Sequence, residues 1–455
     1  MIRMQRSKPR TAGTKMRSRR VTMRFTDDSG AVGLVLKPKE VVDCDLSNGV
    51  LQTLPEWEYM LDENGNKFNC NIPNTLEVGS FKVDEGKKAY KNAYYLITRA
   101  GSYLYYMADA PGYYSVAVNR TQVVPFFVRE ASTPRVALCT RKGFLMSSLD
   151  GSYKTVIEND TLAAGALFKH RVFVALKGGV LKYSAPEDFS NFGETENLGG
   201  SMAFPHCGGE IIAMKPYQDT LYIFFKSGIM RLKAGGEPSG FYAERLDYAG
   251  GDIFSRTICV CQHAIYFLSR SGLYRLKGKK TERLDLDVDF PQEETGFEGC
   301  SVWKDRPMIR YHVGDDVYKT IIVGKDGKSA FFMKDLADLG RGEDGRVFFT
   351  DKGKYLCQLT DKGTYWFDGR FNTQATDFGY SGKKRLECLR FYGEGSFTLS
   401  ILWNGMIVSK HLEFVNGVAE WRFDRMEYGE EYQMTFELGR MTKITSVQAE
   451  YKTVA

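Results

Sequence analysis

An internal repeat constrains the fold of this chain more than any other feature. The segment Tyr222–Leu232 (YIFFKSGIMRL) recurs as Tyr266–Leu276 (YFLSRSGLYRL), with Tyr, Ser, Gly, Arg and the final Leu in register. Each copy consists of two short runs of β-branched, aromatic and aliphatic residues, which favour strands. A Ser-Gly pair separates the runs, and glycine can adopt the positive φ of a tight turn. Each copy therefore predicts a β-hairpin.

The turn glycine of this hairpin can be followed along the chain. It recurs with a basic residue two positions before it at Gly101, Gly143, Gly179, Gly228 and Gly272, and two weaker copies follow at Gly314 and Gly353. Successive intervals are 42, 36, 49, 44, 42 and 39 residues. A four-stranded propeller blade takes about 40–50 residues, whereas a solenoid rung takes about half of that. The period predicts a β-propeller of six or seven blades.

Length and composition agree with a mostly β protein. A chain of 455 residues usually divides into domains, and its 26 Tyr, 30 Phe and 46 Gly favour strands and turns. Near the C-terminus, alternating hydrophobic runs are joined by Asn404-Gly405 and Asn416-Gly417, a strong hairpin signal. The predicted fold class is all-β, a propeller followed by a small C-terminal β-sandwich. The predicted parts are a flexible basic arm at 1–24, the propeller at 25–375 and the sandwich at 376–455.

The basic charge of the chain is concentrated at its start. The formal net charge is +6, but the first twenty residues hold eight cations and no acid, so the remainder is close to neutral. These arm cations are Arg3, Arg6, Lys8, Arg10, Lys15, Arg17, Arg19 and Arg20. A segment with so little to bury is not expected to fold alone. It is either a solvated tail or an arm that contacts nucleic acid or a neighbouring subunit; Pro9 and the lack of an apolar face argue against an organellar transit peptide.

The marker turns supply a second set of cations. These are Arg99, Arg141, Lys177, Lys226 and Arg270. If the turns lie on one rim of the propeller, they repeat a positive charge around an axis, which suits a phosphate backbone. The alternative is that basic residues simply solvate exposed turns.

No catalytic or metal-binding constellation stands out in the sequence. Zinc, protease and hydrolase motifs are absent, as are nucleotide-binding motifs, so no enzyme activity, cofactor or metal is predicted. Cys259-x-Cys261-x-His263 could place three ligands on one strand face, but its apolar neighbours favour a buried strand. Asp285, Asp287 and Asp289 could hold calcium, although a charged edge strand is the preferred interpretation. The nine single cysteines predict reduced, buried thiols in a protein made in a cytosol, and no apolar run predicts membrane insertion.

Two segments carry a resemblance to a known family. The segment Tyr183–Phe192 (YSAPEDFSNF) follows a strand, and Asp377-Phe-Gly with Lys383-Lys384 leads into the terminal strands. This pattern resembles the blade ends and C-terminal region of bacteriophage β-propeller tail-hub and packaged-DNA stabilisation proteins, which are head-to-tail connector components. The resemblance covers roughly residues 94–455 as an architecture, and the region before Tyr94 does not contribute to it.

The resemblance implies a structural role in a virion. The expected function is that of a tail-hub or head-to-tail connector protein in a homo-oligomeric ring around the DNA path, which helps to retain packaged DNA. Expected partners are portal or adaptor proteins and distal tail components, with non-specific DNA contact. The expected location is the tail or head-tail junction of a particle assembled in the host cytoplasm. One alternative is a carbohydrate-binding or glycosidase-like propeller acting on cell-surface glycans, and another is a monomeric host scaffold propeller.

Overall fold

The chain divides into two compact units. The computed structural model describes residues 17–453, except for gaps at 26–33, 47–48, 55, 62–64, 68–74, 83–91, 99–102, 109–112, 118–122, 131–132, 141–142, 148–152, 159–161, 195–197, 205–206, 208, 287, 315–316, 325–329, 334–335, 342–345, 352–353, 361 and 425. One unit is formed by Pro55–Tyr365, and the other by Met1–Leu54 together with Trp366–Ala455. The described residues are almost all in strands or their connections, with short 3₁₀ turns at η3 (Pro238–Gly240), η4 (Ser255–Thr257) and η5 (Glu294–Gly296).

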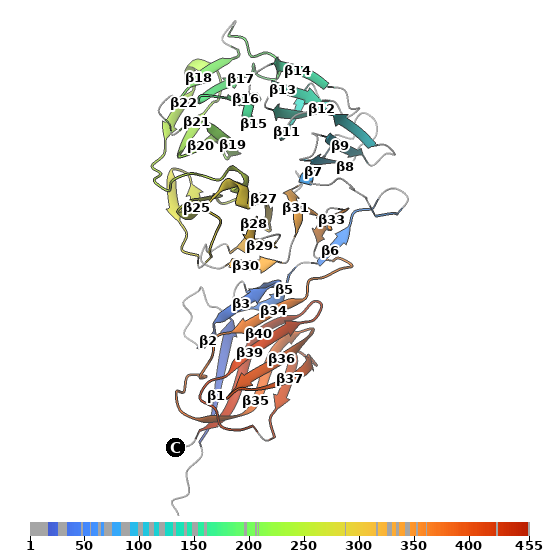
Figure 1. Ribbon diagram of the computed structural model, residues 1–455, viewed down its shortest axis with the longest axis vertical. Helices are drawn as coiled ribbons and strands as arrows, with labels where there is room; N and C mark the ends of the chain where they lie inside the picture. Colours follow the sequence, from blue (N-terminus) through green and yellow to red (C-terminus); the bar gives the residue numbers. More distant parts are fainter. Residues whose placement is uncertain are drawn as a thin grey trace, which may run out of the picture. The chain divides into compact units, whose positions relative to one another are not determined.

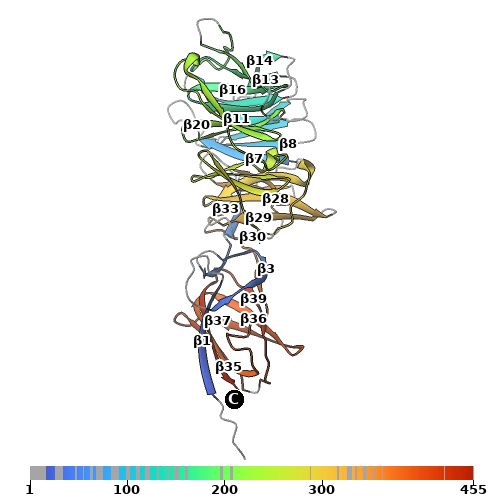
Figure 2. The ribbon, with the colours of Figure 1, turned by 90° about the vertical axis from the view of Figure 1, so that its left-hand side faces the viewer.

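The unit Pro55–Tyr365 is a seven-bladed β-propeller in its described residues (Figure 1). Each blade is a four-stranded antiparallel sheet, and Figure 2 shows the ring from its edge. The strands of each blade are given from the inner strand outward. The first blade consists of β7 (Thr75–Lys82), β8 (Asn92–Thr98), β9 (Tyr103–Ala108) and β10 (Tyr113–Ala117), and the second of β11 (Val123–Glu130), β12 (Thr133–Thr140), β13 (Gly143–Ser147) and β14 (Tyr153–Glu158). The third consists of β15 (Leu162–Phe168), β16 (Arg171–Leu176), β17 (Val180–Tyr183) and β18 (Gly200–Ala203), and the fourth of β19 (Ile211–Tyr217), β20 (Thr220–Phe225), β21 (Gly228–Lys233) and β22 (Tyr242–Arg245).

The remaining three blades close the ring. The fifth blade consists of β23 (Cys259–Val260), β24 (Ile265–Ser269), β25 (Gly272–Lys277) and β26 (Lys280–Arg283). The sixth consists of β27 (Phe297–Trp303), β28 (Arg306–Gly314), β29 (Val317–Val323) and β30 (Ala330–Met333), and the seventh of β31 (Ala337–Arg341), β32 (Val347–Asp351), β33 (Tyr355–Thr360) and β6 (Glu56–Tyr59). The outer strand of the seventh blade therefore comes from the start of the propeller unit, and Tyr59 pairs with Cys357. The inner strands β31 and β7 contact each other, so the first and last blades meet.

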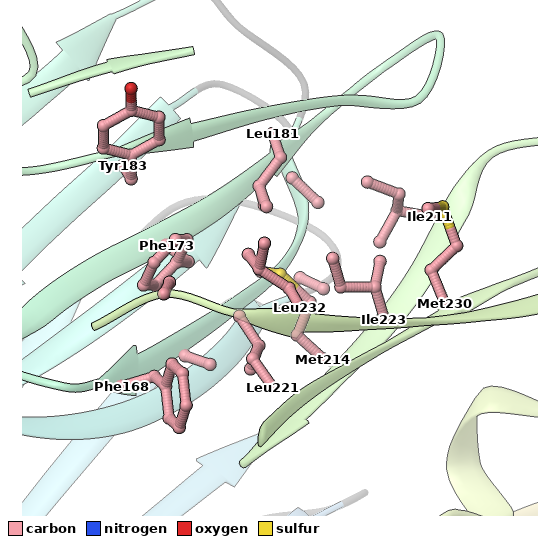
Figure 3. Close-up of a cluster of buried hydrophobic side chains, with 14 of the residues drawn as sticks. Phe168, Phe173, Leu181, Tyr183, Ile211, Met214, Leu221, Ile223, Met230 and Leu232 are labelled. Carbon is pink, nitrogen blue, oxygen red and sulfur yellow. The ribbon is translucent and has the colours of Figure 1, made fainter. Parts of the chain in front are cut away.

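Hydrophobic clusters lie between neighbouring blades and hold the ring together. In Figure 3, Phe173 and Leu181 of the third blade pack with Leu221, Ile223 and Leu232 of the fourth. Similar clusters join the second blade to the third, the fourth to the fifth and the fifth to the sixth. Since each fully buried side chain of this size contributes about 1.5–3 kcal/mol, the interfaces between blades are a main source of stability.

The second unit is a β-sandwich of two sheets. One sheet has the order β2 (Leu34–Leu36), β1 (Arg17–Phe25), β40 (Lys443–Thr453), β35 (Lys384–Glu394), β38 (Val418–Arg422), and β40 also pairs with β5 (Leu51–Thr53), which pairs with β4 (Cys44–Asp45). The other sheet has the order β3 (Pro38–Val42), β34 (Gly369–Thr373), β39 (Gln433–Leu438), β36 (Ser396–Trp403), β37 (Met406–Glu413). The predicted turns Asn404-Gly405 and Asn416-Gly417 have positive φ at both residues, as turns of type I′ require. Asn404-Gly405 joins the paired strands β36 and β37, as predicted, whereas Asn416-Gly417 leads from β37 to β38 in the other sheet, so these two strands do not form a hairpin.

Five phenylalanines from both sheets form the core of the sandwich. Phe25 and Phe391 come from the first sheet, and Phe371, Phe397 and Phe436 come from the second. All five are fully buried, and the ring of Phe25 lies edge-on to those of Phe371 at 5.5 Å and Phe436 at 5.6 Å. Edge-to-face geometry of this kind adds to the energy of burial.

The structure confirms the all-β class, the propeller and the sandwich, but it corrects the predicted boundaries. Residues 17–54 belong to the sandwich, so the propeller is inserted between Leu54 and Trp366 and the sandwich is not purely C-terminal. The predicted arm at 1–24 is also too long, because β1 begins at Arg17 and pairs with β40. The physical reason is the alternation of Val21, Met23 and Phe25, which buries Met23 and Phe25 in the sandwich.

A ladder of alternating charges crosses the outer face of the first sandwich sheet. Arg390 of β35 contacts Glu420 of β38 and Glu450 of β40, each at 2.5 Å. Glu450 also pairs with Arg20 of β1, and Glu420 pairs with Arg422 at 2.5 Å. A network of this kind stabilises more than isolated surface pairs do. The ladder therefore connects strands from both ends of the chain.

The ladder predicts acid sensitivity of the sandwich. Hydrogen bonds from Arg390 and Arg422 lower the pKa of Glu420. Partial burial raises the pKa of Glu450, but hydrogen bonds from Arg390 and Arg20 outweigh it, so the net pKa is lowered. Groups with a lowered folded pKa stabilise above the unfolded value of about 4.3 and lose this contribution as the pH falls. We expect thermal unfolding of the sandwich to shift to lower temperature below about pH 4.3.

The double variant Glu420→Gln/Glu450→Gln provides the comparison for this prediction. Its unfolding temperature should depend less on pH between about pH 5 and pH 3 than that of the unchanged protein. Glu437→Gln, an exposed substitution on the other sheet, is the matched control and should leave the pH profile as it is. Equal profiles for the double variant and the unchanged protein would contradict the assignment.

Candidate assembly and nucleic-acid interface

The marker glycines found in the sequence occupy one equivalent position in every blade. Each lies at the turn between the second and third strands, for example between β20 and β21 for Gly228 and between β24 and β25 for Gly272. The turns of Gly101 and Gly353 lie outside the described residues, but the strands on both sides of each are described. Because all blades share the same antiparallel strand order, these turns emerge on one face of the ring. The described turns at Gly179, Gly228 and Gly272 therefore lie on one face of the propeller.

Three of the five predicted rim cations can be placed. Lys177, Lys226 and Arg270 are exposed at their turns, whereas Arg99 and Arg141 lie outside the described residues. Lys226 and Arg270 belong to neighbouring blades, and both approach the carboxylate of Asp252, at 3.8 Å and 3.3 Å. This acid follows the outer strand of the fourth blade, so it neutralises part of the charge that the sequence predicts for the rim. The side chains of Lys226 and Arg270 remain about two-thirds exposed, at 65% and 63%.

Gly143, next to one of these turns, cannot be replaced by a larger residue without a steric clash. Its φ is +139°, and a Cβ atom would lie 1.8 Å from the carbonyl oxygen of Ile157. We expect Gly143→Ala to lower the free energy of unfolding by about 1–3 kcal/mol more than Gly178→Ala does, because overpacking adds to backbone strain. Gly178 also has a positive φ, of +84°, but no atom lies within 4 Å of the position that a Cβ atom would take. Chemical denaturation measures both, and equal losses would contradict the role of the Ile157 contact.

The repeated hairpin segment is a structural element of the blades. Tyr222 pairs across strands with Arg231, which contacts Glu244 at 2.9 Å. The second copy repeats this arrangement with Tyr266, Arg275 and Glu282, and the last two are 3.0 Å apart. Both tyrosines are buried, and burial raises the pKa of Tyr266 to about 12. The repeated Tyr, Arg and Leu residues thus pack within the blades.

The metal-like cluster of the sequence has another role. His263 lies between Asp305 of the next blade and Tyr266, with both ring nitrogens 2.6 Å from their oxygen partners. Cys259 and Cys261 are buried, and burial, reinforced by the neighbouring Cys300, raises the pKa of Cys259 well above its usual value. Thiols in this state are poor metal ligands. No group of three His, Cys, Asp or Glu side chains suited to a metal occurs in the part of the chain that the structure describes.

The acidic segment after β26 differs from its predicted form. Asp285 and Asp289 are exposed, and the described residues around them form a connection to η5 and not an edge strand. Asp287 lies outside the described residues. The physical reason is that aspartate is depleted in strands, so a run of alternating aspartates is better solvated outside a sheet.

The predicted arm is divided by the start of β1. Arg3, Arg6, Lys8, Arg10 and Lys15 lie outside the described residues. Arg17, Arg19 and Arg20 belong to β1, where Arg20 pairs with Glu450 and the guanidinium of Arg19 lies 4.8 Å from the ring centroid of Tyr380. The prediction that Arg19 and Arg20 belong to a free arm is therefore wrong, because both side chains contact other residues of the sandwich. The predicted arm therefore ends before Arg17.

One surface cluster was missed in the sequence. Trp57 and Tyr59 of β6, Tyr355 of β33 and Tyr365 gather on the outer part of the seventh blade. We call these four residues the ring cluster. The alternating pattern Trp-Glu-Tyr in β6 was a usable signal, but the pairing of β6 with β33 spans about 300 residues and leaves no local trace.

Comparisons with known proteins add no function to the fold. No family model matches the sequence, and no curated protein matches it. Similar solved structures include BBS1N in complex with ARL6DN, with a TM-score of 0.44 and 6% identity over 67% of this chain and 97% of that chain. A gluconolactonase from Xanthomonas campestris has a TM-score of 0.35 and 8% identity over 68% and 99%. The extracellular domain of BT4673 from B. thetaiotaomicron has a TM-score of 0.45 and 9% identity over 93% and 63%.

The class of protein follows from the strand pairing itself. In its described residues the chain is a seven-bladed β-propeller inserted into a β-sandwich. No helix among the described residues is long and apolar enough to cross a membrane. The eight described cysteines form no disulfide with one another.

Proposed function

We propose that this chain is a structural virion protein of a tailed phage, a tail-hub or head-to-tail connector component. It assembles as a homo-oligomeric ring around the DNA path, helps to retain packaged DNA, and contacts portal or adaptor proteins and distal tail components. It acts without catalysis, at the tail or head-tail junction. The marker turn carries a basic residue in five of the seven repeats of the sequence. The observation that carries the proposal is that the three of these cations that the structure describes, Lys177, Lys226 and Arg270, lie at equivalent turns of consecutive blades.

The physical argument concerns charge without base recognition. A phosphate backbone needs cations at intervals and no sequence readout, and exposed turns on a rigid ring supply such cations. Lys177, Lys226 and Arg270 extend from three consecutive blades, and residues 1–16 add five cations without an acid. The sequence resemblance to phage propeller proteins supports the same function.

Charge reversal tests the DNA contact. The triple variant Lys177→Glu/Lys226→Glu/Arg270→Glu should weaken binding to duplex DNA and reduce the slope of log affinity against log salt by up to about three. The matched control reverses Lys169, Lys279 and Lys304, which lie at turns of the opposite face. Equal salt slopes for the two triple variants would count against the rim as the DNA-facing surface.

Electron cryo-microscopy of DNA-filled particles tests the assembly. We expect the chain to form a ring at the head-tail junction, and deletion of residues 1–16 to impair ring assembly or DNA retention. Normal assembly of DNA-filled particles by the deletion variant would argue against a role for the arm. A chain that stays monomeric with its particle partners would argue against the connector function.

A glycan-binding function is the second candidate, favoured by Tyr365 of the ring cluster, whose side chain is 37% exposed. Aromatic platforms are common in carbohydrate recognition because sugar faces stack on rings. Incubation with cell-surface glycans distinguishes the two functions. Saturable binding that Tyr365→Ala abolishes, or cleavage of the glycan, would favour this candidate over the connector.

A further inference from the structure

The ring cluster is an ordered arrangement of aromatic faces on the seventh blade. Trp57 and Tyr365 are stacked, with centroids 4.6 Å apart and an interplanar angle of 21°. Tyr59 lies edge-on to Trp57 at 5.1 Å, to Tyr365 at 5.1 Å and to Tyr355 at 5.7 Å. Tyr365 is 37% exposed, and the other three are half-buried. The face of Tyr59 is therefore bordered by rings on two sides.

An ammonium group already occupies this arrangement. The Nζ atom of Lys67 lies 3.5 Å from the ring centroid of Tyr59, 5.5 Å from that of Tyr355 and 5.8 Å from that of Tyr365. Lys67 is exposed, and it forms no ion pair with the residues that the structure describes. Rings rather than a carboxylate thus hold its charge, which is the geometry of a cation–π site.

A carboxylate behind the cluster strengthens the site. Tyr59 donates a hydrogen bond from its hydroxyl to Oδ2 of Asp351 at 2.6 Å. Burial and this hydrogen bond raise the pKa of Tyr59, so the phenol stays protonated. A phenol that donates to an anion has a more electron-rich ring face, which attracts a cation more strongly.

We propose that the ring cluster is a binding site for the basic side chains of residues 1–16 from a second copy of this chain, and that Lys67 occupies the site until such a segment displaces it. The inference rests on the homo-oligomeric ring of the proposed function. Residues 1–16 contain five cations and no acid, and they precede Arg17, the exposed first residue of β1.

The geometry favours a cation over a flat sugar ring as the ligand. The stacked faces of Trp57 and Tyr365 cover each other, and Lys67 covers the face of Tyr59. An exposed cation–π contact is weak, with about 0.5–1 kcal/mol, so a single exposed lysine can be displaced by a segment that offers several cations.

Binding of a fluorescent peptide with the sequence of residues 1–16 to the full chain tests the proposal. Lys67→Met removes the resident cation and should increase the affinity about two- to fivefold. Tyr59→Leu removes the ring that touches the cation and should decrease the affinity by a similar factor or more. Tyr242→Leu is the matched control, because Tyr242 is 57% exposed on the fourth blade, and it should leave the affinity unchanged.

Two further measurements make the result decisive. A peptide in which Gln replaces all Arg and Lys should not bind to the site, and unfolding curves verify that each variant remains folded. Absence of peptide binding, or equal affinity for the Tyr59→Leu and Lys67→Met variants, would overturn the proposal. Tyr59→Phe should retain most of the binding because it keeps the ring and loses only the contact with Asp351.

The outcomes separate this inference from the proposed function. If the chain forms rings but the Tyr59 and Lys67 variants bind the peptide as the unchanged chain does, the connector function stands and the cation site is wrong. If the variants change peptide affinity as expected while the chain remains monomeric in particle assembly, binding of cations by the ring cluster is supported, but its occupation by a second copy and the connector function are both contradicted.

Discussion

Replacing Phe25 with alanine will lower the free energy of unfolding of the sandwich by about 3–5 kcal/mol. Phe25 is fully buried, and its ring contacts those of Phe371 and Phe436 across the two sheets. The substitution leaves a cavity that the neighbouring aromatic residues cannot fill without moving. Chemical denaturation measures the loss, and Ile407→Ala, at a site that is 67% exposed, should change stability by less than about 0.5 kcal/mol.

Two truncations extend this prediction to the whole strand. Deletion of residues 1–16 should leave the unfolding curve unchanged, whereas deletion of residues 1–25 should prevent the sandwich from folding. The second deletion removes β1, which lies between β2 and β40 in its sheet. If the protein lacking residues 1–25 unfolds as cooperatively as the unchanged protein, β1 is not an integral strand.

Arg171→Ala will destabilise the propeller by about 3 kcal/mol. The guanidinium of Arg171 is buried and donates hydrogen bonds to the carbonyl oxygens of Ser184 at 2.8 Å, Leu198, and Gly236 of the next blade at 3.3 Å. Burial lowers its pKa, yet the three carbonyl groups hold the charged form in place. Alanine leaves the buried carbonyl oxygen of Ser184 without this donor and removes the contacts with Leu198 and Gly236. Thermal unfolding measures the loss.

Lysine at the same position separates charge from geometry. Arg171→Lys retains a cation, but a single ammonium cannot reach three acceptors as the planar fork does. We expect an intermediate loss of stability and faster amide hydrogen exchange in the connections around Ser184 and Gly236. Wild-type stability in both variants would show that this contact between blades does not contribute.

The blade pattern could be predicted because its signals are local. The two strands of the hairpin at Gly228 are neighbours in sequence, and the same holds for the hairpin at Asn404-Gly405. Hydrophobic alternation and turn residues within about ten residues are then enough to specify the hairpin. Seven such turns at a period near 42 were sufficient to predict a propeller, although they did not decide between six and seven blades.

The candidate interface was predictable only in part. The common rim followed from the period, but the proximity of Asp252 to both Lys226 and Arg270 depends on how two blades pack. Likewise, Lys67 and Tyr355 of the cation site are far apart in the sequence and meet only through the pairing of β6 with β33.

The sequence by itself determined the repeat, the hairpins and the all-β class of this protein, because each depends on residues that are close along the chain. The tertiary structure alone decided that β6 closes the seventh blade, that the propeller interrupts the sandwich, and that Arg17–Phe25 is a strand. These features arise from strand pairing over hundreds of residues. Such pairing is stabilised by burial in the folded state. The alternation of Val21, Met23 and Phe25 therefore stabilises a strand only when β40 pairs with it.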